Sequence, residues 1–214
     1  MSIKLTMADY GVYLLRVYSC IHQNREYITA LDAATGDGDH WVNMDHGFAE
    51  IVSMLPDLRK QTIFEGFQTI AMTMLSAIGG SGGALYGSAY LQAAKAATGM
   101  NVIDTHGMCL LLHAMLDGMI HRGGSKPGMK TMIDALHPAV ERYESGLRAE
   151  ECEQDLFVAV REAAINGAES TKDMEAVRGR ACYQADKGVG HLDPGAVTMA
   201  YQLTVLMDFL CEKL

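Results

Sequence analysis

The sequence predicts an all-α protein, an antiparallel up-down bundle of seven or eight helices of about 15 residues each. Apolar residues recur at three- and four-residue spacing along most of the chain. No window shows the sustained alternation rich in Val, Ile and Thr that is typical of strands. The connections are short, which favours antiparallel neighbours. Because no repeat or change of composition divides the chain, we expect a single domain over residues 1–214.

The periodic stretches define the expected helices in order. The first begins at Thr6 and ends near Asn24, and the next runs from Asn43 to about Leu55, where Pro56 stops it. Further helices are expected over 62–77, 83–97, 104–122, 131–145, 152–170 and 195–211, with a weaker turn or helix over 172–179.

Alternation of the helices predicts where the loops meet. The acidic loop follows the first expected helix, and glycine-bearing loops over 79–83, 123–128 and 190–195 follow alternate helices. If neighbouring helices run in opposite directions, these four loops lie at the same end of the bundle. The sequence therefore predicts one composite site.

The composition excludes several classes of protein. A net charge of −9 and a pI near 5.3 argue against a nucleic-acid-binding surface. The five cysteines are scattered without a C-x-x-C pair, which favours a reducing cytoplasm over a disulfide framework or a zinc site. The N-terminus lacks a secretory pattern, and the apolar run 108–120 is too short to span a bilayer. We therefore expect a cytoplasmic protein with neither a membrane segment nor a nucleic-acid partner.

The stretch 32–40 is the strongest candidate for chemistry. It contains three carboxylates, Asp32, Asp37 and Asp39, next to His40 and separated by glycines. Carboxylates this close raise one another's pKa unless a cation neutralises them. Mg²⁺ prefers oxygen ligands and keeps positions for phosphates, so it is the natural ion here. The alternative is an acidic loop that caps a helix and binds nothing.

Three further loops contain groups suited to a phosphate. Gly79–Gly83 precedes a helix and could cradle an anion with its amides, or it could simply form a tight turn. Lys130 could neutralise phosphate charge or be a solvated lysine, and Arg180 beside a glycine suits bidentate phosphate contact. Asp193 and Pro194 mark a helix start.

Taken together, these loops favour phosphoryl transfer. The chain lacks the Gly-x-Ser-x-Gly and His-Glu-x-x-His patterns of serine hydrolases and metalloproteases. A carboxylate-bound metal, an amide cradle and one or two cations are what phosphoryl transfer requires. We assign no catalytic residue beyond the metal and phosphate ligands.

The motifs Gly36-Asp37-Gly38-Asp39-His40, Leu85-Tyr86-Gly87, Lys130-Thr131-Met132, Gly179-Arg180-Ala181 and Asp193-Pro194-Gly195 occur in this order along nearly the whole chain. In this they resemble the DhaL family, the nucleotide-binding subunit of phosphotransferase-system-dependent dihydroxyacetone kinase. The resemblance implies an eight-helix antiparallel barrel that binds ADP or ATP and two Mg²⁺ ions at one end.

The resemblance also implies residue roles and partners. Asp32, Asp37 and Asp39 would bind the metal. The nucleotide contacts would come from His40, Trp41, Asn43, Ser81, Gly82, Gly123, Met132, Arg180, Asp193, Pro194 and Gly195. ADP would stay bound, accept phosphate from a DhaM-like phosphotransferase-system subunit, and pass it to dihydroxyacetone on a DhaK-like partner. A transcriptional regulator and a homodimer are further partners that the resemblance leaves open.

Several positions depart from the usual family pattern, namely Trp41, Gly82, Met129 and the pair Asp45-His46. The indole of Trp41 could stack on the adenine or alter partner docking, and Gly82 lacks a hydroxyl that could contact phosphate. Alternatives to the dihydroxyacetone kinase subunit are a kinase subunit for a related ketose, a regulatory paralogue that binds ADP without turnover, and a stand-alone metal-dependent phosphohydrolase.

Overall fold

The computed structural model describes residues 3–214 and confirms the all-α fold. Its long helices are α1 (Met7–Gln23), α3 (His40–Ser53), α5 (Ile63–Ala77), α6 (Gly80–Ala96), α7 (Thr105–Gly123), α8 (Ile133–Arg148), α9 (Glu153–Ser170) and α10 (Pro194–Cys211). Two short helices, α2 (Arg25–Thr35) and α4 (Leu55–Leu58), flank α3. Within residues 3–214 the one β-type pairing is an isolated bridge between Leu5 and Ile103.

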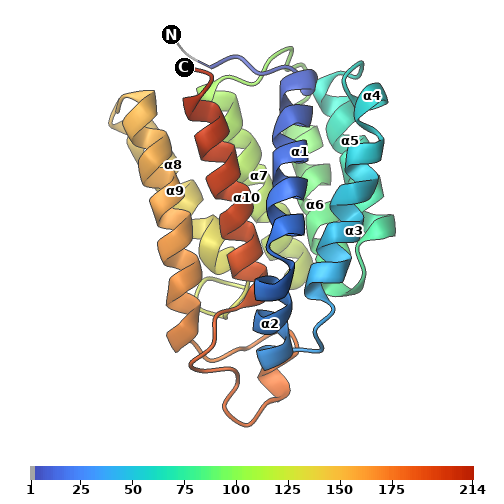
Figure 1. Ribbon diagram of the computed structural model, residues 1–214. Coiled ribbons are helices and arrows are strands. Elements are labelled where there is room, and N and C mark those ends of the chain that lie inside the picture. The colour runs from blue at the N-terminus through green and yellow to red at the C-terminus, as the bar shows by residue number, and fades with distance from the viewer. Residues whose placement is uncertain (1–2) are drawn as a thin grey trace.

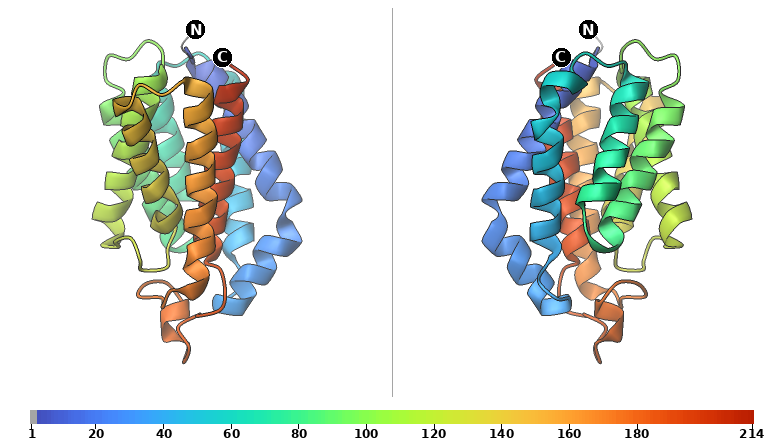
Figure 2. Two further views of the ribbon diagram at one scale, coloured as in Figure 1. Left: turned by 90° about the vertical axis from the view of Figure 1, so that its left-hand side faces the viewer. Right: turned by 90° about the vertical axis from the view of Figure 1, so that its right-hand side faces the viewer.

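The long helices form a closed ring, as Figures 1 and 2 show. Each contacts the next one along the chain, and α10 packs against α1 and so closes the barrel. Large apolar side chains from different helices fill the interior, among them Phe48, Phe67, Phe157 and Phe209, which are essentially fully buried. Burial of this apolar surface is the main contribution to folding stability.

Neighbouring helices run in opposite directions, as the sequence predicts. The start of α1 and the end of α10 lie at one end of the barrel, and α2 and the connection between α9 and α10 lie at the other. The acidic loop and the three glycine-bearing loops therefore share the end opposite the start of α1 (Figure 1). This arrangement brings segments far apart in the sequence to one rim.

Several helix starts follow the expected capping chemistry. Thr6 and Thr62 begin α1 and α5 with capping boxes that involve Asp9 and Glu65. Asp193 accepts a hydrogen bond from the backbone N–H of Ala196, and proline occupies the first turn of α10. These starts agree with the predicted boundaries within one residue.

The region between α1 and α3 differs from the prediction. Asp32 lies in the last turn of α2, a helix that the sequence analysis did not predict, and α3 begins at His40 rather than Asn43. At the bend, the carbonyl of Asn24 accepts from Ile28 N–H at 3.0 Å while its own N–H donates back into α1. Asn24 occupies the N-cap position of α2, but its side chain donates to the carbonyl of Cys20 in α1 and does not cap α2.

Two smaller differences concern loops. The helix expected from residue 83 begins at Gly80, and the weak element expected over 172–179 is reduced to one 3-10 turn, Thr171–Asp173. None of the helices within residues 3–214 is long and apolar enough to cross a membrane.

Candidate functional site

The three aspartates of the acidic loop converge. One carboxylate oxygen from each of Asp32, Asp37 and Asp39 lies within 4.8 Å of the others. Asp32 is buried at the end of α2, where its Oδ2 accepts a hydrogen bond from the backbone N–H of His40 at 3.0 Å. Gly38 adopts a φ of +78°, which lets the loop turn back between the other two carboxylates. The arrangement provides clustered hard oxygen donors of the kind that Mg²⁺ binds.

His40 stands on the first turn of α3 and faces α10. Its Nε2 lies 2.9 Å from Oγ1 of Thr198, whose hydroxyl also lies 3.2 Å from the carbonyl of Gly195. Burial lowers the pKa of His40, although the charges of Asp32 and Asp39 act in the opposite direction. His40 is therefore a neutral, positioned imidazole near neutral pH.

In the turn between α5 and α6, the backbone of Gly83 lies very close to the carbonyl groups at the end of α5. A Cβ on Gly83 would lie 2.2 Å from the carbonyl oxygen of Ile78 and 2.9 Å from that of Met74. A Cβ on Gly79 would lie 2.6 Å from Oδ1 of Asn43 on α3. Glycine is thus required for packing here, and no side chain caps the first turn of α6.

Four helix N-termini point toward the same end, those of α3, α6, α8 and α10. The N-terminal turn of a helix presents unpaired N–H groups and a partial positive charge, which favour bound anions. The uncapped first turn of α6 offers such amides next to the acidic cluster. The site therefore combines a place for a cation with a place for an anion.

The loop before α8 is held by Asp134. Its carboxylate accepts from the backbone N–H of Gly128 at 2.5 Å and from that of Thr131 at 2.7 Å. Lys130, between them, has a φ of +58° and is almost completely buried. The prediction of a solvated lysine is therefore wrong, because the segment that follows α9 covers this side chain.

That segment, residues 171–193, carries Arg180 to the acidic cluster. Nη2 of Arg180 lies 2.5 Å from Oδ2 of Asp37, and both side chains are accessible to solvent. At the end of the segment, burial raises the pKa of Asp193 to about 7, and the charges of Asp134 and Asp32 raise it further. The N–H of Ala196 and the charge of Lys130 act in the opposite direction. The site thus holds one carboxyl that titrates near neutrality.

One cavity of about 710 Å³ lies at this end of the barrel, and Lys130 is among the residues that line it. The predicted metal ligands line it. So do His40, Asn43, Ser81, Gly82, Gly123, Met132, Arg180, Asp193, Pro194 and Gly195. Its size suits a nucleotide-sized ligand.

Trp41 is the one predicted contact that does not line this cavity. Its Nε1–H donates to the carbonyl of Ile21 at 3.0 Å, and the guanidinium of Arg25 lies 4.7 Å from its ring centre. The indole is buried against α1 and α2, so in this structure it is not placed to stack on a ligand in the cavity.

Some residues of the cavity wall were not predicted from the sequence. Arg122, Arg178 and Tyr183 line it, and Tyr183 is 89% exposed. Arg122 ends α7 just before the glycine-bearing loop, and Arg178 lies two residues before Arg180. Proximity to predicted contacts was the only signal that could have identified them.

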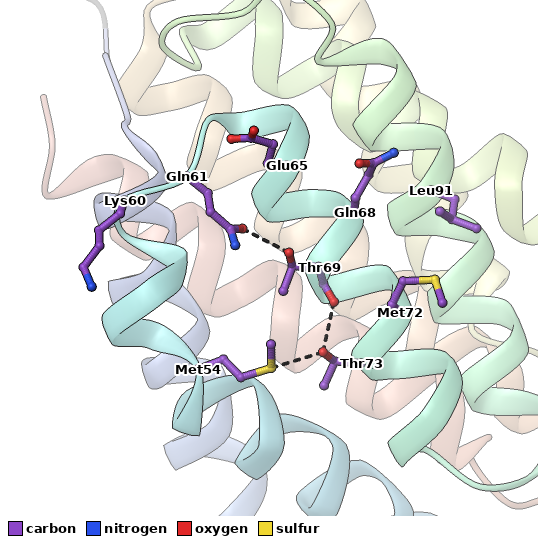
Figure 3. A pocket seen from close by; sticks show the side chains of 9 residues that line it. All are labelled: Met54, Lys60, Gln61, Glu65, Gln68, Thr69, Met72, Thr73 and Leu91. Atoms are coloured by element: carbon purple, nitrogen blue, oxygen red, sulfur yellow. Dashed lines mark hydrogen bonds between the residues drawn. The ribbon is translucent and has the colours of Figure 1, made fainter.

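A second hollow of about 700 Å³ lies on the outside of α5 (Figure 3). Residues that precede α5 in the chain and Leu91 of α6 also line it. Its polar groups pair among themselves, since Thr69 donates to Gln61 at 3.0 Å and Thr73 contacts the sulfur of Met54. Among residues 3–214, Lys60 and Glu65 are the charged residues that line this hollow, and it has no carboxylate cluster like that of Asp32, Asp37 and Asp39. The cavity at the acidic loop is therefore the candidate functional site.

Known proteins share this sequence and fold. Residues 34–208 match the DAK2 domain family. The chain is 38% identical to the ADP-binding subunit DhaL of PEP-dependent dihydroxyacetone kinase 1 from Listeria innocua, over 84% of this chain and 85% of that protein. It is 35% identical to the corresponding DhaL subunit from Escherichia coli, over 91% and 92% of the two chains.

A solved structure agrees with these relatives. The dihydroxyacetone kinase from C. freundii, in complex with AMP-PNP and Mg²⁺, superposes with a TM-score of 0.69 and 28% identity. The match covers 92% of this chain and 33% of that one. This chain therefore belongs to the DAK2 domain family and, within it, to the DhaL subunits of dihydroxyacetone kinases.

Proposed function

We propose that this chain binds Mg²⁺ and ADP or ATP and is the phosphoryl-transfer subunit of a phosphoenolpyruvate-dependent dihydroxyacetone kinase. ADP would accept a phosphoryl group from a DhaM-like phosphotransferase-system subunit and become ATP. The γ-phosphoryl group would then pass to a hydroxyl oxygen of dihydroxyacetone on a DhaK-like partner, which restores ADP. The observation that supports this most is the convergence of three carboxylates and four helix N-termini on one cavity.

The carboxylate cluster fits the metal. Asp32, Asp37 and Asp39 supply closely spaced oxygen atoms, and we propose that they hold two Mg²⁺ ions. Bound Mg²⁺ neutralises charge on phosphate oxygens. The N–H···O bond from His40 orients the carboxylate of Asp32. Preorganised ligands of this kind reduce the entropic cost of binding.

The remaining residues of the cavity would hold the nucleotide. The first-turn amides of α6, including those of Ser81 and Gly82, would donate to phosphate oxygens, and Arg180 would add a cation; all three residues line the cavity. Met132 and Gly123 provide apolar or bare backbone surface for the base and ribose. A cytoplasmic location, a homodimer and a transcriptional regulator as partner stay predictions.

A reconstituted reaction tests this function. Purified chain would be mixed with a DhaK-like subunit, dihydroxyacetone, a catalytic amount of ADP, Mg²⁺ and a phosphorylated DhaM-like protein. We expect dihydroxyacetone phosphate to form only when this chain is present. Formation of phosphate ester from a tetrulose but not from dihydroxyacetone would reassign the sugar, and no product from either would refute the proposal.

A matched pair of variants links the reaction to the acidic cluster. Asp37→Asn removes one charge from the cluster, whereas Asp45→Asn removes a carboxylate that pairs with His22 outside the cavity. We expect Asp37→Asn to weaken Mg²⁺-dependent ADP binding at least about tenfold, the equivalent of about 1.4 kcal/mol. Isothermal titration should show no such loss for Asp45→Asn. Equal affinities for the two variants would contradict the assignment of the metal ligands.

A further inference from the structure

The connection between α9 and α10, residues 171–193, covers the cavity end of the barrel and is called the α9–α10 segment below. It protrudes beyond the helices in both views of Figure 2 and contains only two single 3-10 turns, Thr171–Asp173 and Ala181–Tyr183. Arg180 lies on this segment and reaches Asp37 from it. Because regular structure is scarce here, a few specific contacts must define where Arg180 lies.

Lys130 makes the contacts that join the two ends of this segment. Its Nζ donates hydrogen bonds to the carbonyl oxygen of Thr171 and, at 2.5 Å, to that of His191. Two further hydrogen bonds join the same two ends of the segment. The N–H of Gly190 donates to the carbonyl of Lys172 at 2.8 Å, and the N–H of Asp193 donates to Oγ1 of Thr171 at 3.0 Å. One side chain from the α7–α8 loop therefore bridges the beginning and the end of the segment.

The middle of the segment also packs on Lys130. A Cβ on Gly188 would lie 3.2 Å from Cε of Lys130 and 3.1 Å from Cβ of Ala181, the residue after Arg180. The backbone N–H of Val177 donates to the carbonyl of Met129, next to Lys130, at 3.2 Å. The part of the chain that carries Arg180 thus lies directly against the lysine stem and its loop.

Holding a lysine in this place is unfavourable unless its contacts compensate. Burial lowers the pKa of Lys130, and the surrounding carboxylates of Asp193, Asp173, Asp134 and Asp186 act against that shift. Its φ of +58° is one that non-glycine residues rarely adopt. The ammonium is thus stabilised by its two carbonyl acceptors and by nearby negative charge, and both acceptors belong to the α9–α10 segment.

We propose that Lys130 is a positioning residue that fixes the α9–α10 segment over the cavity and thereby sets the position of Arg180 beside Asp37. The consequence for nucleotide binding rests on the proposed function, whereas the consequence for the segment does not. Lys130 then acts on the ligand through Arg180 and makes no contact of its own with phosphate.

Hydrogen exchange on the nucleotide-free protein tests the structural part. Lys130→Met keeps the length of the side chain but removes its N–H donors, and Lys126→Met removes an exposed lysine of the same loop as the control. We expect Lys130→Met to speed exchange at least about tenfold in peptides that contain Ala176 and Gly190, whose amides bond within the segment, with α5 and α6 unchanged. Exchange equal to that of wild type and Lys126→Met would overturn the proposal.

A double-mutant cycle on Mg²⁺–ADP affinity tests the link to Arg180. Lys130→Met and Arg180→Gln should each weaken binding about tenfold, and the double variant should bind within about twofold of Arg180→Gln alone. If the two losses instead multiply and exchange in the segment is unchanged, Lys130 contacts phosphate directly and the proposal is wrong.

The proposal can still be tested if Lys130→Met does not fold or if the chain binds no nucleotide. Should Lys130→Met fail to fold, Lys130→Gln keeps a polar side chain that is too short to reach both carbonyl acceptors and should give the same pattern of faster exchange. Should the wild-type chain bind no Mg²⁺–ADP, the proposed function fails, and the exchange experiment still decides the role of Lys130.

Discussion

At the scale of single residues, the first turn of α3 separates neighbours in the sequence. His40 and Asn43, three residues apart, both line the cavity, while Trp41 points toward α1 and α2. This follows from the helical period, which places residues three apart on one face and turns adjacent residues about 100° away. The helix was expected to start at Asn43, which would leave residues 40–42 in a loop. The helical period was therefore not applied to Trp41, and it was predicted to contact the nucleotide together with His40 and Asn43.

The placement of Trp41 leads to a prediction. Trp41→Phe should leave Mg²⁺–ADP affinity unchanged, because the indole does not line the cavity. It should lower the free energy of unfolding by about 1–2 kcal/mol, since the carbonyl of Ile21 keeps the N–H of Asn24 but loses its indole donor, and a cavity forms. Titration calorimetry and thermal unfolding measure the two effects. A large loss of affinity without loss of stability would place the indole on the ligand.

Asp193 gives a prediction about pH. Its folded-state pKa of about 7 lies above its ordinary value of 3.8, so the folded chain holds this proton more tightly than the unfolded chain. The stability that this provides is complete below about pH 4 and is lost as pH rises through about 7. Asp193→Asn cannot ionise, so the variant does not lose this stability as pH rises, and it keeps an acceptor for the N–H of Ala196.

The measurement compares the variant with wild type in EDTA without nucleotide. Between about pH 5 and pH 8, the free energy of unfolding of Asp193→Asn should rise relative to wild type by about 1 kcal/mol or more, since one pKa unit equals about 1.4 kcal/mol. Urea unfolding at the two pH values provides the numbers. A difference that does not change with pH would show that Asp193 is ionised alike in the folded and unfolded chains.

At the scale of elements, the α5–α6 turn shows how a glycine-rich motif serves packing and binding together. Gly83→Ala should lower the free energy of unfolding by about 1–3 kcal/mol, since the new Cβ would meet two backbone carbonyls that cannot move independently. That corresponds to a fall in melting temperature of roughly 2–4 °C per kcal/mol for a chain of this size.

Gly82→Ser is the matched control for this turn. A Cβ at Gly82 meets only Cγ2 of Ile78, at 3.3 Å, and that side chain can adjust. We expect the melting temperature of Gly82→Ser to stay close to that of wild type. Equal destabilisation by both substitutions would mean that the whole turn, rather than the approach at Gly83, is intolerant of side chains.

Helix starts with a side-chain cap were predicted within one residue, whereas the starts of α3 and α6, which have none, were predicted three residues too late. Thr6, Thr62 and Asp193 cap their helices with side chains, and the predicted starts agree with the structure. At the bend, Nδ2 of Asn24 donates back to the carbonyl of Cys20 at 2.8 Å, so this side chain stabilises the end of α1 and does not cap the start of α2. Asp32 was therefore expected on a loop, although it lies in the last turn of α2.

At the scale of the whole molecule, the site depends on contacts that span most of the chain. Asp32 and Asp193 approach each other only because the barrel closes where α10 packs against α1. Short connections allowed the shared end of the loops to be predicted. The burial of Lys130 could not be predicted, because it depends on how residues 171–193 fold back over the barrel, and no periodic pattern describes that segment.

Removal of the bound ligand should lower the melting temperature of the barrel. A ligand that binds only the folded state stabilises it by RT ln(1 + [L]/Kd), about 2.7 kcal/mol at a hundredfold excess over Kd. The carboxylates, helix N-termini and Arg180 come together only in the closed barrel, so Mg²⁺ with ADP should raise the melting temperature by roughly 5–11 °C under those conditions. EDTA should reverse the rise, and ADP without Mg²⁺ should give a smaller one, because the aspartates then repel the phosphates. A melting temperature that responds equally to ADP with and without Mg²⁺ would separate the nucleotide from the acidic cluster.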